Sequence, residues 1–194
     1  MKRKLLTLVS VTAIASTLAI GINSAKAADF GYNYIEGSLQ DIDINGTDSD
    51  AATLSGSFDI APNINILVGY SAEQISTPSG FSDIDVDSFG LGIGYHAPVG
   101  DNTDLTASMT AISQDMDIVG DDTGYGLGLG LRHQVNNAVE LGARVEYVDI
   151  HDVDDTTIEI DSRFTIADGV SLGLALSTSS EEVDTLSAGI RFDF

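Results

Sequence analysis

The stretch DIDINGTDSD, residues 41–50, holds the residue types and spacing that most directly suggest chemistry. Carboxylates at Asp41 and Asp43, followed by Gly46, match the first half of the twelve-residue calcium loop that lies between two helices. The twelfth position, however, is Ala52 in place of the glutamate that supplies two oxygen ligands, and no helical periodicity flanks the stretch. We therefore exclude a helix-flanked calcium site.

Aspartates also gather at later places in the chain, each time between two runs of alternating hydrophobicity. Carboxylate oxygens suit hard cations such as Ca²⁺ and Mg²⁺. A solvated acidic surface is the plainer interpretation, and we predict no firm metal site. The candidates for weak binding of a divalent cation are Asp41, Asp43, Asp121, Asp122, Asp154 and Asp155.

A catalytic base is the other chemistry that the residue types allow, because the sequence contains three histidines. His151 lies between Asp149 and Asp152, where an Asp–His pair could act as a general base. No serine is placed to complete a recognisable nucleophile unit, and His96 and His133 belong to the opposite end of the predicted strands. We predict that the protein is not an enzyme and that it needs no cofactor.

The N-terminus has the three parts of a secretory signal. A basic segment, Lys2–Lys4, precedes an apolar run, Leu5–Ile22, and Ala25–Ala27 has the small-x-small pattern of a cleavage site. The alternative is an uncleaved membrane anchor, because the apolar run is nearly long enough to span a bilayer. We predict a cleaved signal peptide at 1–27 and a single domain at 28–194.

Removal of this segment leaves four arginines and no lysine against thirty acidic residues, a formal net charge of −26. Such a chain does not bind nucleic acid or another anionic surface by simple attraction. The hydrophobic content of 43% argues against a disordered acidic chain. The absence of cysteine excludes disulfides and thiolate metal sites.

Alternation of apolar with small or polar residues runs through the chain after residue 27. In Phe89–Tyr95 apolar residues alternate with glycine, and Tyr125–Leu131 repeats this pattern 36 residues later. A period of two residues is typical of β-strands, and Pro, Asn, Asp and Gly mark tight reversals between them. We predict ten strands, with eight as the rival count, at 31–41, 51–60, 64–75, 85–97, 103–114, 123–134, 138–149, 156–166, 170–178 and 184–194.

Three features favour an all-β fold that is a closed antiparallel transmembrane β-barrel over a soluble exported β-sandwich. The predicted strands have about 10–12 residues, which suits a tilted crossing of a bilayer. Short turns alternate with longer acidic loops, as in barrels with short periplasmic turns. The chain also ends in alternating apolar residues with Phe192 and Phe194, which is similar to the signal read by the outer-membrane insertion machinery.

The alternation assigns a face to each residue of a strand. We predict that the apolar parity faces lipid in every strand, with aromatic residues such as Tyr70, Phe89 and Phe164 near strand ends, and that the other parity faces the lumen. The last strand closes against the first, which places Arg191 near Glu36. We infer an ion-pair network in the lumen, with glycines leaving room for its side chains. Its predicted members are Arg132, Arg144, Arg163, Arg191, Glu36, Glu73, Glu140, Glu146, Glu159 and Asp161.

The start of the predicted mature chain, Tyr32–Gly37, taken with the signal, the strands and the terminal Phe194, resembles the small outer-membrane β-barrel superfamily. This superfamily includes OmpA-like and opacity-type surface proteins of Gram-negative bacteria. The resemblance covers almost the whole chain after residue 27 and is one of pattern more than of motif. It implies the fold and a place in the outer membrane, and it carries over no catalytic residue. Many members have eight strands, so a count of ten departs from them.

The sequence therefore predicts a non-enzymatic integral outer-membrane barrel with acidic extracellular loops and a structural or surface-interaction role. We favour a filled lumen over a narrow ion-conducting porin because ten strands enclose little free space. A soluble exported β-sandwich is the second alternative. The expected partners are outer-membrane lipid, lipopolysaccharide and the insertion machinery. Divalent cations that bridge the aspartates to lipopolysaccharide are a further hypothesis, beside the plainer one of a solvated acidic surface.

Overall fold

The computed structural model describes residues 31–44, 47–76, 83–116, 120–151 and 153–194. The predicted signal peptide at 1–27 lies outside these residues. Within them, no helix is long and apolar enough to cross a membrane.

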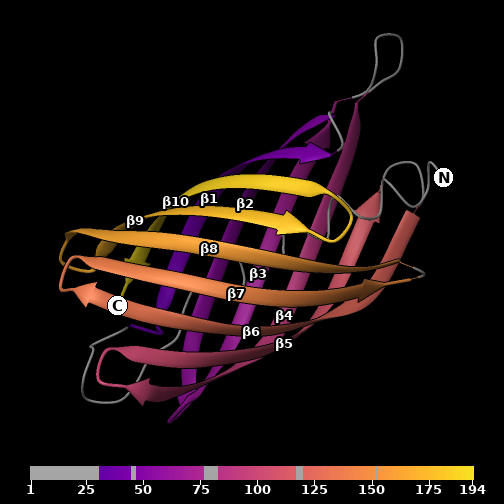
Figure 1. Cartoon of the computed structure of the whole chain (residues 1–194). Coiled ribbons are helices and arrows are strands. Elements are labelled where there is room, and N and C mark those ends of the chain that lie inside the picture. Colours follow the sequence, from indigo (N-terminus) through magenta and orange to yellow (C-terminus); the bar gives the residue numbers. More distant parts are fainter. Residues whose placement is uncertain (1–30, 45–46, 77–82, 117–119, 152) are drawn as a thin grey trace.

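The described chain forms one closed antiparallel barrel (Figure 1). Each strand pairs with its neighbours in sequence, and the last strand pairs with the first, so no edge is left open. The predicted count of ten strands is confirmed, and both eight strands and a two-sheet sandwich are wrong. The strands are β1 (Tyr34–Ile44), β2 (Asp48–Ala61), β3 (Ile64–Ile75), β4 (Ile84–Gly100), β5 (Thr103–Met116), β6 (Gly120–Asn136), β7 (Val139–Ile150), β8 (Val153–Ala167), β9 (Val170–Ser179) and β10 (Val183–Asp193).

The two ends of the barrel differ in their connections. At the end that holds the C-terminus, called here the inner end, each even-numbered strand from β2 to β8 shifts register just before a tight turn. Two of these turns use a residue in the left-handed region, Asn63 (φ 67°) and Gly169 (φ 66°), residue types that adopt it at low cost. The opposite end, called the outer end, carries the β1–β2, β3–β4, β5–β6, β7–β8 and β9–β10 connections.

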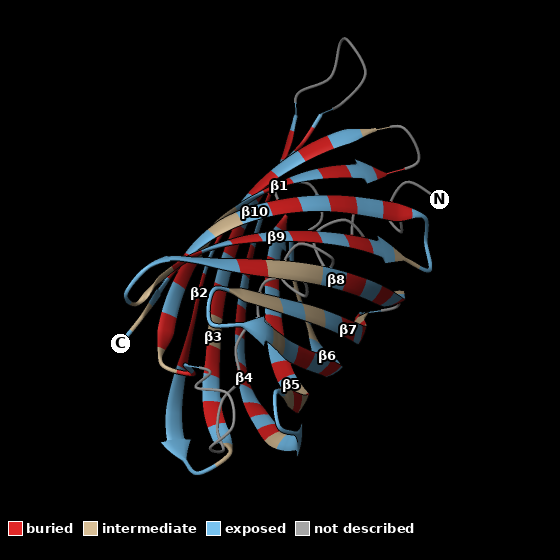
Figure 2. Cartoon of the chain, turned by 60° about the vertical axis from the view of Figure 1, so that its left-hand side comes forward, coloured by how far each residue is buried: buried red, intermediate tan, exposed pale blue. Residues whose placement is uncertain are grey.

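Through most of the barrel, apolar side chains point outward and small or polar ones point inward. Figure 2 shows the resulting alternation of buried and exposed residues along each strand. Tyr70, Phe89 and Phe164 are exposed on this wall, on the predicted parity. The exposed apolar side chains form a band around the barrel, called here the belt. It also includes Leu39, Leu54, Leu91, Ile93, Leu127, Leu129, Leu131, Ile160, Leu174 and Leu186.

At the outer end the pattern inverts. In β1 the side chains of Ile42 and Ile44 are buried while Asp41 and Asp43 are exposed, and β4 does the same with Ile84 and Asp85. The prediction that the apolar parity faces lipid in every strand is therefore wrong at this end. The physical reason is that the strands continue past the apolar belt, and a barrel wall that stands in water must bury its apolar residues and expose its charges.

The predicted acidic loops are shorter than expected, because most of their aspartates belong to strands. The DIDINGTDSD stretch lies in β1 up to Ile44 and in β2 from Asp48, and only residues 45–47 connect the two strands. Three of the other outer connections are also short, at 117–119, 151–152 and 180–182, and the one at 76–83 is longer. Tyrosines mark the level where the belt ends, since the Tyr70 hydroxyl donates to Asp87 at 2.6 Å.

Candidate functional site in the barrel lumen

The middle of the lumen contains ion pairs that join different strands. Arg144 on β7 contacts Glu159 on β8 (Nη2–Oε1 2.9 Å) and Glu146 on its own strand (Nε–Oε2 3.3 Å). On β6, Arg132 donates from Nη2 to Oε2 of Glu140 at 2.6 Å and from Nε to Oε1, in a two-pronged pair. The guanidinium groups of Arg132 and Arg144 are buried, so these pairs are shielded from bulk water.

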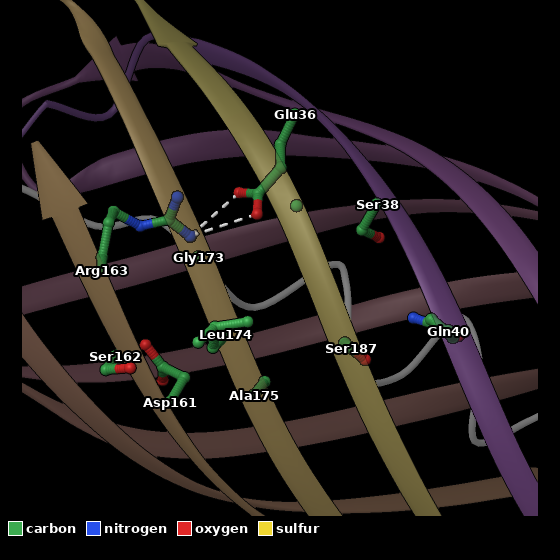
Figure 3. Close-up of a pocket in the computed structure, with 11 residues that line it drawn as sticks. Glu36, Ser38, Gln40, Asp161, Ser162, Arg163, Gly173, Leu174, Ala175 and Ser187 are labelled. Atoms are coloured by element: carbon green, nitrogen blue, oxygen red, sulfur yellow. Dashed lines mark hydrogen bonds and ion pairs between the residues drawn. The ribbon is translucent and has the colours of Figure 1, made fainter. Parts of the chain in front are cut away.

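Glu36 on β1 is shared by two arginines. Nη2 of Arg163 on β8 lies 3.2 and 3.1 Å from the two carboxylate oxygens, and Nε of Arg191 on β10 lies 3.1 Å from Oε2. Figure 3 shows Arg163 pointing across the lumen to this carboxylate. The register also sets Glu36 directly opposite Arg191 across the seam that closes the barrel. One carboxylate therefore ties the first strand to the last and to β8.

Glycines on the inward parity give the charged side chains their space. A Cβ at Gly142 would overlap the carboxylate of Asp161, and one at Gly189 would lie 3.0 Å from Oε1 of Glu36. A space of about 450 Å³ at the inner end borders Arg132, Glu140 and Arg163, whereas two spaces deeper among the charged groups are small. One lies between Glu36, Asp161 and Arg163 and one beside Arg132, Arg144 and Asp161, each of about 10 Å³, which is about the room that one water needs.

Two predicted network members make other contacts. Oε1 of Glu73 accepts a hydrogen bond from the Ser49 hydroxyl at 2.7 Å. Asp161 borders the small spaces beside the arginines but has no ion pair among those described above. The structure thus brings together all four arginines with Glu36, Glu140, Glu146 and Glu159, and of these pairings the sequence specified only Arg191 with Glu36.

A buried apolar layer, called here the cap, lines the lumen at the outer end. Its residues come from six strands, and Val153 of a seventh packs against them. A second apolar cluster, Leu67, Ile112, Val148 and Ile150, lines the lumen on β3, β5 and β7. The cap consists of Ile42, Ile44, Ala51, Ile75, Ile84, Val86, Met116 and Val183, all at most 7% exposed.

An aromatic group that sequence reasoning missed lies towards the inner end. Tyr32 stacks on His96 with ring centroids 4.0 Å apart, and its hydroxyl donates to Asp104 Oδ2 at 3.1 Å. Burial raises the pKa of Tyr32 well above its usual value, so this hydroxyl stays protonated and can donate. On β1, the Tyr34 ring lies 3.8 Å below the guanidinium carbon of Arg191. The sequence did contain a signal for their inward position, because Tyr32 and Tyr34 alternate in step with Glu36 and so lie on the same side of the strand.

A family model described as an outer membrane protein beta-barrel domain matches residues 11–164. The chain belongs to this family of outer-membrane β-barrels. Its localisation is therefore the outer membrane of a Gram-negative cell, and the inner end of the barrel, with its tight turns, corresponds to the periplasmic side. No curated protein matches the chain.

Solved outer-membrane barrels share the fold at low identity. The KdgM porin in complex with disordered oligogalacturonate is 12% identical, with a TM-score of 0.51 over 83% of this chain and 99% of that one. An outer-membrane channel from Pseudomonas putida F1 is 10% identical (TM-score 0.52, 89% and 100% covered). The translocator domain of the autotransporter NalP from Neisseria meningitidis is 11% identical (TM-score 0.53, 97% and 95% covered). At these identities the likeness shows the fold alone.

The metal candidates of this outer-membrane barrel lie on strands and do not converge. Asp41, Asp43, Asp121 and Asp154 face outward on β1, β6 and β8, whereas Asp155 is buried and accepts from the Ser180 hydroxyl at 2.7 Å. Asp122 lies 3.2 Å from Nδ1 of His151. Within the described ranges, no three His, Cys, Asp or Glu side chains are grouped so that they could hold a metal ion.

The remaining sequence candidates lie at the two ends of the barrel. His151 pairs with Asp122 and not with the aspartates beside it in sequence, and its side chain is 66% exposed. Phe192 and Phe194 point outward at the inner end, where the Phe194 ring lies 6.1 Å from that of Phe58.

Proposed function

We propose that the protein is a non-enzymatic outer-membrane barrel whose lumen is closed and whose role is exerted at its outer wall, as a structural or surface-interaction protein. The observation that carries this proposal is the cap. Apolar side chains from six consecutive strands form one buried layer there, and an apolar constriction excludes ions by excluding their water.

The layer beneath the cap supports the same function. The ion pairs of Arg132, Arg144, Arg163 and Arg191 link strands across this layer, and two of the spaces beside them hold about one water each. A larger space of about 450 Å³ borders Arg132, Arg163 and Arg191 at the inner end. A lumen of this kind stabilises the barrel and does not offer a continuous path for solutes.

The outer wall is the surface that remains for function. Its aspartates face each other across strands, as in the pairs Asp41–Asp50, Asp43–Asp48 and Asp149–Asp154. Divalent cations that bridge these carboxylates to lipopolysaccharide phosphates would offset the repulsion between like charges. The partners in this proposal are outer-membrane lipid and lipopolysaccharide, together with the insertion machinery during assembly.

A narrow cation-preferring pore is the second candidate, and the composition of the lumen favours it. Two of the solved barrels with the same fold are named as a porin and a channel. The inward carboxylates outnumber the four arginines, so an opened lumen would attract cations. These carboxylates are Glu36, Glu73, Asp104, Glu140, Glu146, Asp155, Glu159, Asp161 and Asp193.

Conductance of the unmodified protein distinguishes the two candidates. After refolding and insertion into a planar bilayer, we expect no conductance steps at moderate voltage, because the cap keeps the outer lumen dry. A shift in gel migration between heated and unheated samples serves as the control for folding. Regular steps in every bilayer that holds folded protein would favour the pore instead.

A further inference from the structure

A groove of about 550 Å³ crosses the exposed face of the wall near its outer end. It spans β8, β9, β10 and β1, which lie side by side around the barrel (Figure 1). Four aliphatic side chains line it, each more than half exposed, together with three carboxylates. The aliphatic residues are Ile158, Ile160, Leu176 and Leu186, and the acidic ones are Asp41, Asp43 and Asp184.

The strand register orders these groups into two rows. In the row nearer the apolar belt, Asp41 is opposite Leu186, which is opposite Leu176, which is opposite Ile160. In the row nearer the outer end, Asp43 is opposite Asp184, followed by Thr178 and Ile158. Both rows therefore change from carboxylate on β1 to aliphatic on β8. The groove has an acidic end and an apolar end.

The apolar end continues into the belt that faces hydrocarbon. The next row towards the inner end sets Leu39 opposite Ala188 and Ala188 opposite Leu174, and the two leucines are strongly exposed. The groove thus lies at the level where headgroups meet acyl chains, and a ligand there has one part in each environment.

The acidic end favours a cation. Asp43 faces Asp184 on one side and Asp48 on the other, and like charges directly opposite each other destabilise a sheet. Among the described residues no Lys or Arg is on this wall, because the four arginines are all buried in the lumen. A positively charged group in the groove would be attracted to the carboxylates of Asp41, Asp43 and Asp184.

We propose that the groove binds a lipid amphiphile of the outer leaflet that carries an ammonium headgroup. The headgroup lies between Asp41, Asp43 and Asp184, and the chain lies over Leu176, Leu186 and Ile160 before it enters the bilayer. This inference does not depend on whether the lumen is closed, so its failure would leave the conductance prediction unaffected.

The test uses the absence of cysteine, since a single introduced thiol carries the only label. Thr178→Cys places an environment-sensitive fluorophore in the groove, and Thr123→Cys places it at an equivalent exposed position on β6. Both proteins are inserted in phosphatidylcholine bilayers and titrated with a nitroxide-labelled C18 amine or with the uncharged C18 alcohol that carries the same nitroxide.

At Thr178→Cys we expect the amine to quench the fluorophore in a saturable way. Half-maximal quenching should need a mole fraction of amine on the order of fivefold lower than that of the alcohol, because exposed ion pairs contribute about this much to binding. At Thr123→Cys the two probes should differ less and show no saturation. Two triple variants are made in the Thr178→Cys protein. Replacement of the groove carboxylates (Asp41→Asn, Asp43→Asn, Asp184→Asn) should abolish the preference for the amine over the alcohol. Replacement of three carboxylates outside the groove (Asp115→Asn, Asp121→Asn, Asp149→Asn) should leave that preference unchanged. Equal preference at both positions, or preference that survives the first triple replacement, would overturn the proposal.

Discussion

Replacement of Glu36 by Gln is expected to lower the free energy of unfolding of the barrel by at least about 3–5 kcal/mol, the loss typical when one partner of a buried ion pair is removed. The amide keeps the size of the carboxylate but not its charge. Arg163 and Arg191 both depend on that charge, and all three side chains are at most 5% exposed. The contact also joins β1 to β10 at the seam of the barrel, so its loss should weaken closure.

Urea titration of the refolded protein in lipid vesicles, followed by the migration of the folded form on a gel, measures this effect. Glu181→Gln is the matched control because Glu181 is exposed in the β9–β10 connection. It should change stability by less than about 0.5 kcal/mol, as is usual for exposed positions. If Glu36→Gln behaved like Glu181→Gln, Glu36 would not hold the lumen together.

Opening the cap is expected to convert a silent barrel into a conducting one. Ile42, Ile84 and Val183 are buried members of the cap on β1, β4 and β10. Their replacement by Ser shortens the side chains and lets water wet the constriction. Because carboxylates outnumber arginines on the inward parity, the current should be cation-selective.

Planar bilayers with a KCl gradient across them give both the conductance and, from the reversal potential, the selectivity. The control carries the same three replacements on the exposed wall, at Ile66, Ile93 and Val145, and should remain silent. A folded cap variant without conductance would show that the cap is not what closes the lumen. An anion-selective current would contradict the assigned charge of the lumen.

The strand number and the closure of the barrel could be predicted because both follow from local pattern. The glycine alternation of Phe89–Tyr95 and of Tyr125–Leu131 is long enough to identify a strand and its two faces. The tight turns near Asn63 and Gly169 then fix which strands are neighbours. Ten strands and both ends on one side follow from these local features.

The pairings inside the lumen could not be predicted in the same way. Arg163 reaches Glu36 on a strand that is not adjacent to its own, and this depends on the tilt and stagger of the strands around the barrel. Neither quantity is encoded in the residues of one strand. Only the Arg191–Glu36 contact, which follows from direct pairing of the first and last strands, was within reach of the sequence.

The outer ends of the strands were missed for a different reason. Asp, Asn and Gly in 41–50 have the composition of a loop, yet Asp41–Ile44 still alternates and so still has the pattern of a strand. The composition of this stretch indicated a loop and its alternation indicated a strand, and the structure has a strand. The same inversion, with Ile inside and Asp outside, is what forms the cap.

The central claim is that the strands extend into water at the outer end with apolar residues inside and aspartates outside. Since the chain has no cysteine, single thiols can be placed at neighbouring positions of β4, with Asp87→Cys on the exposed wall and Ser88→Cys in the lumen, where Ser88 is 3% exposed. A membrane-impermeant charged thiol reagent is then added to sealed vesicles in which the outer end of the barrel faces the medium. Asp87→Cys should react as an open thiol and Ser88→Cys at least about a hundredfold more slowly, as expected for a group that reacts only when the structure opens. Equal rates at the two positions would contradict the claim.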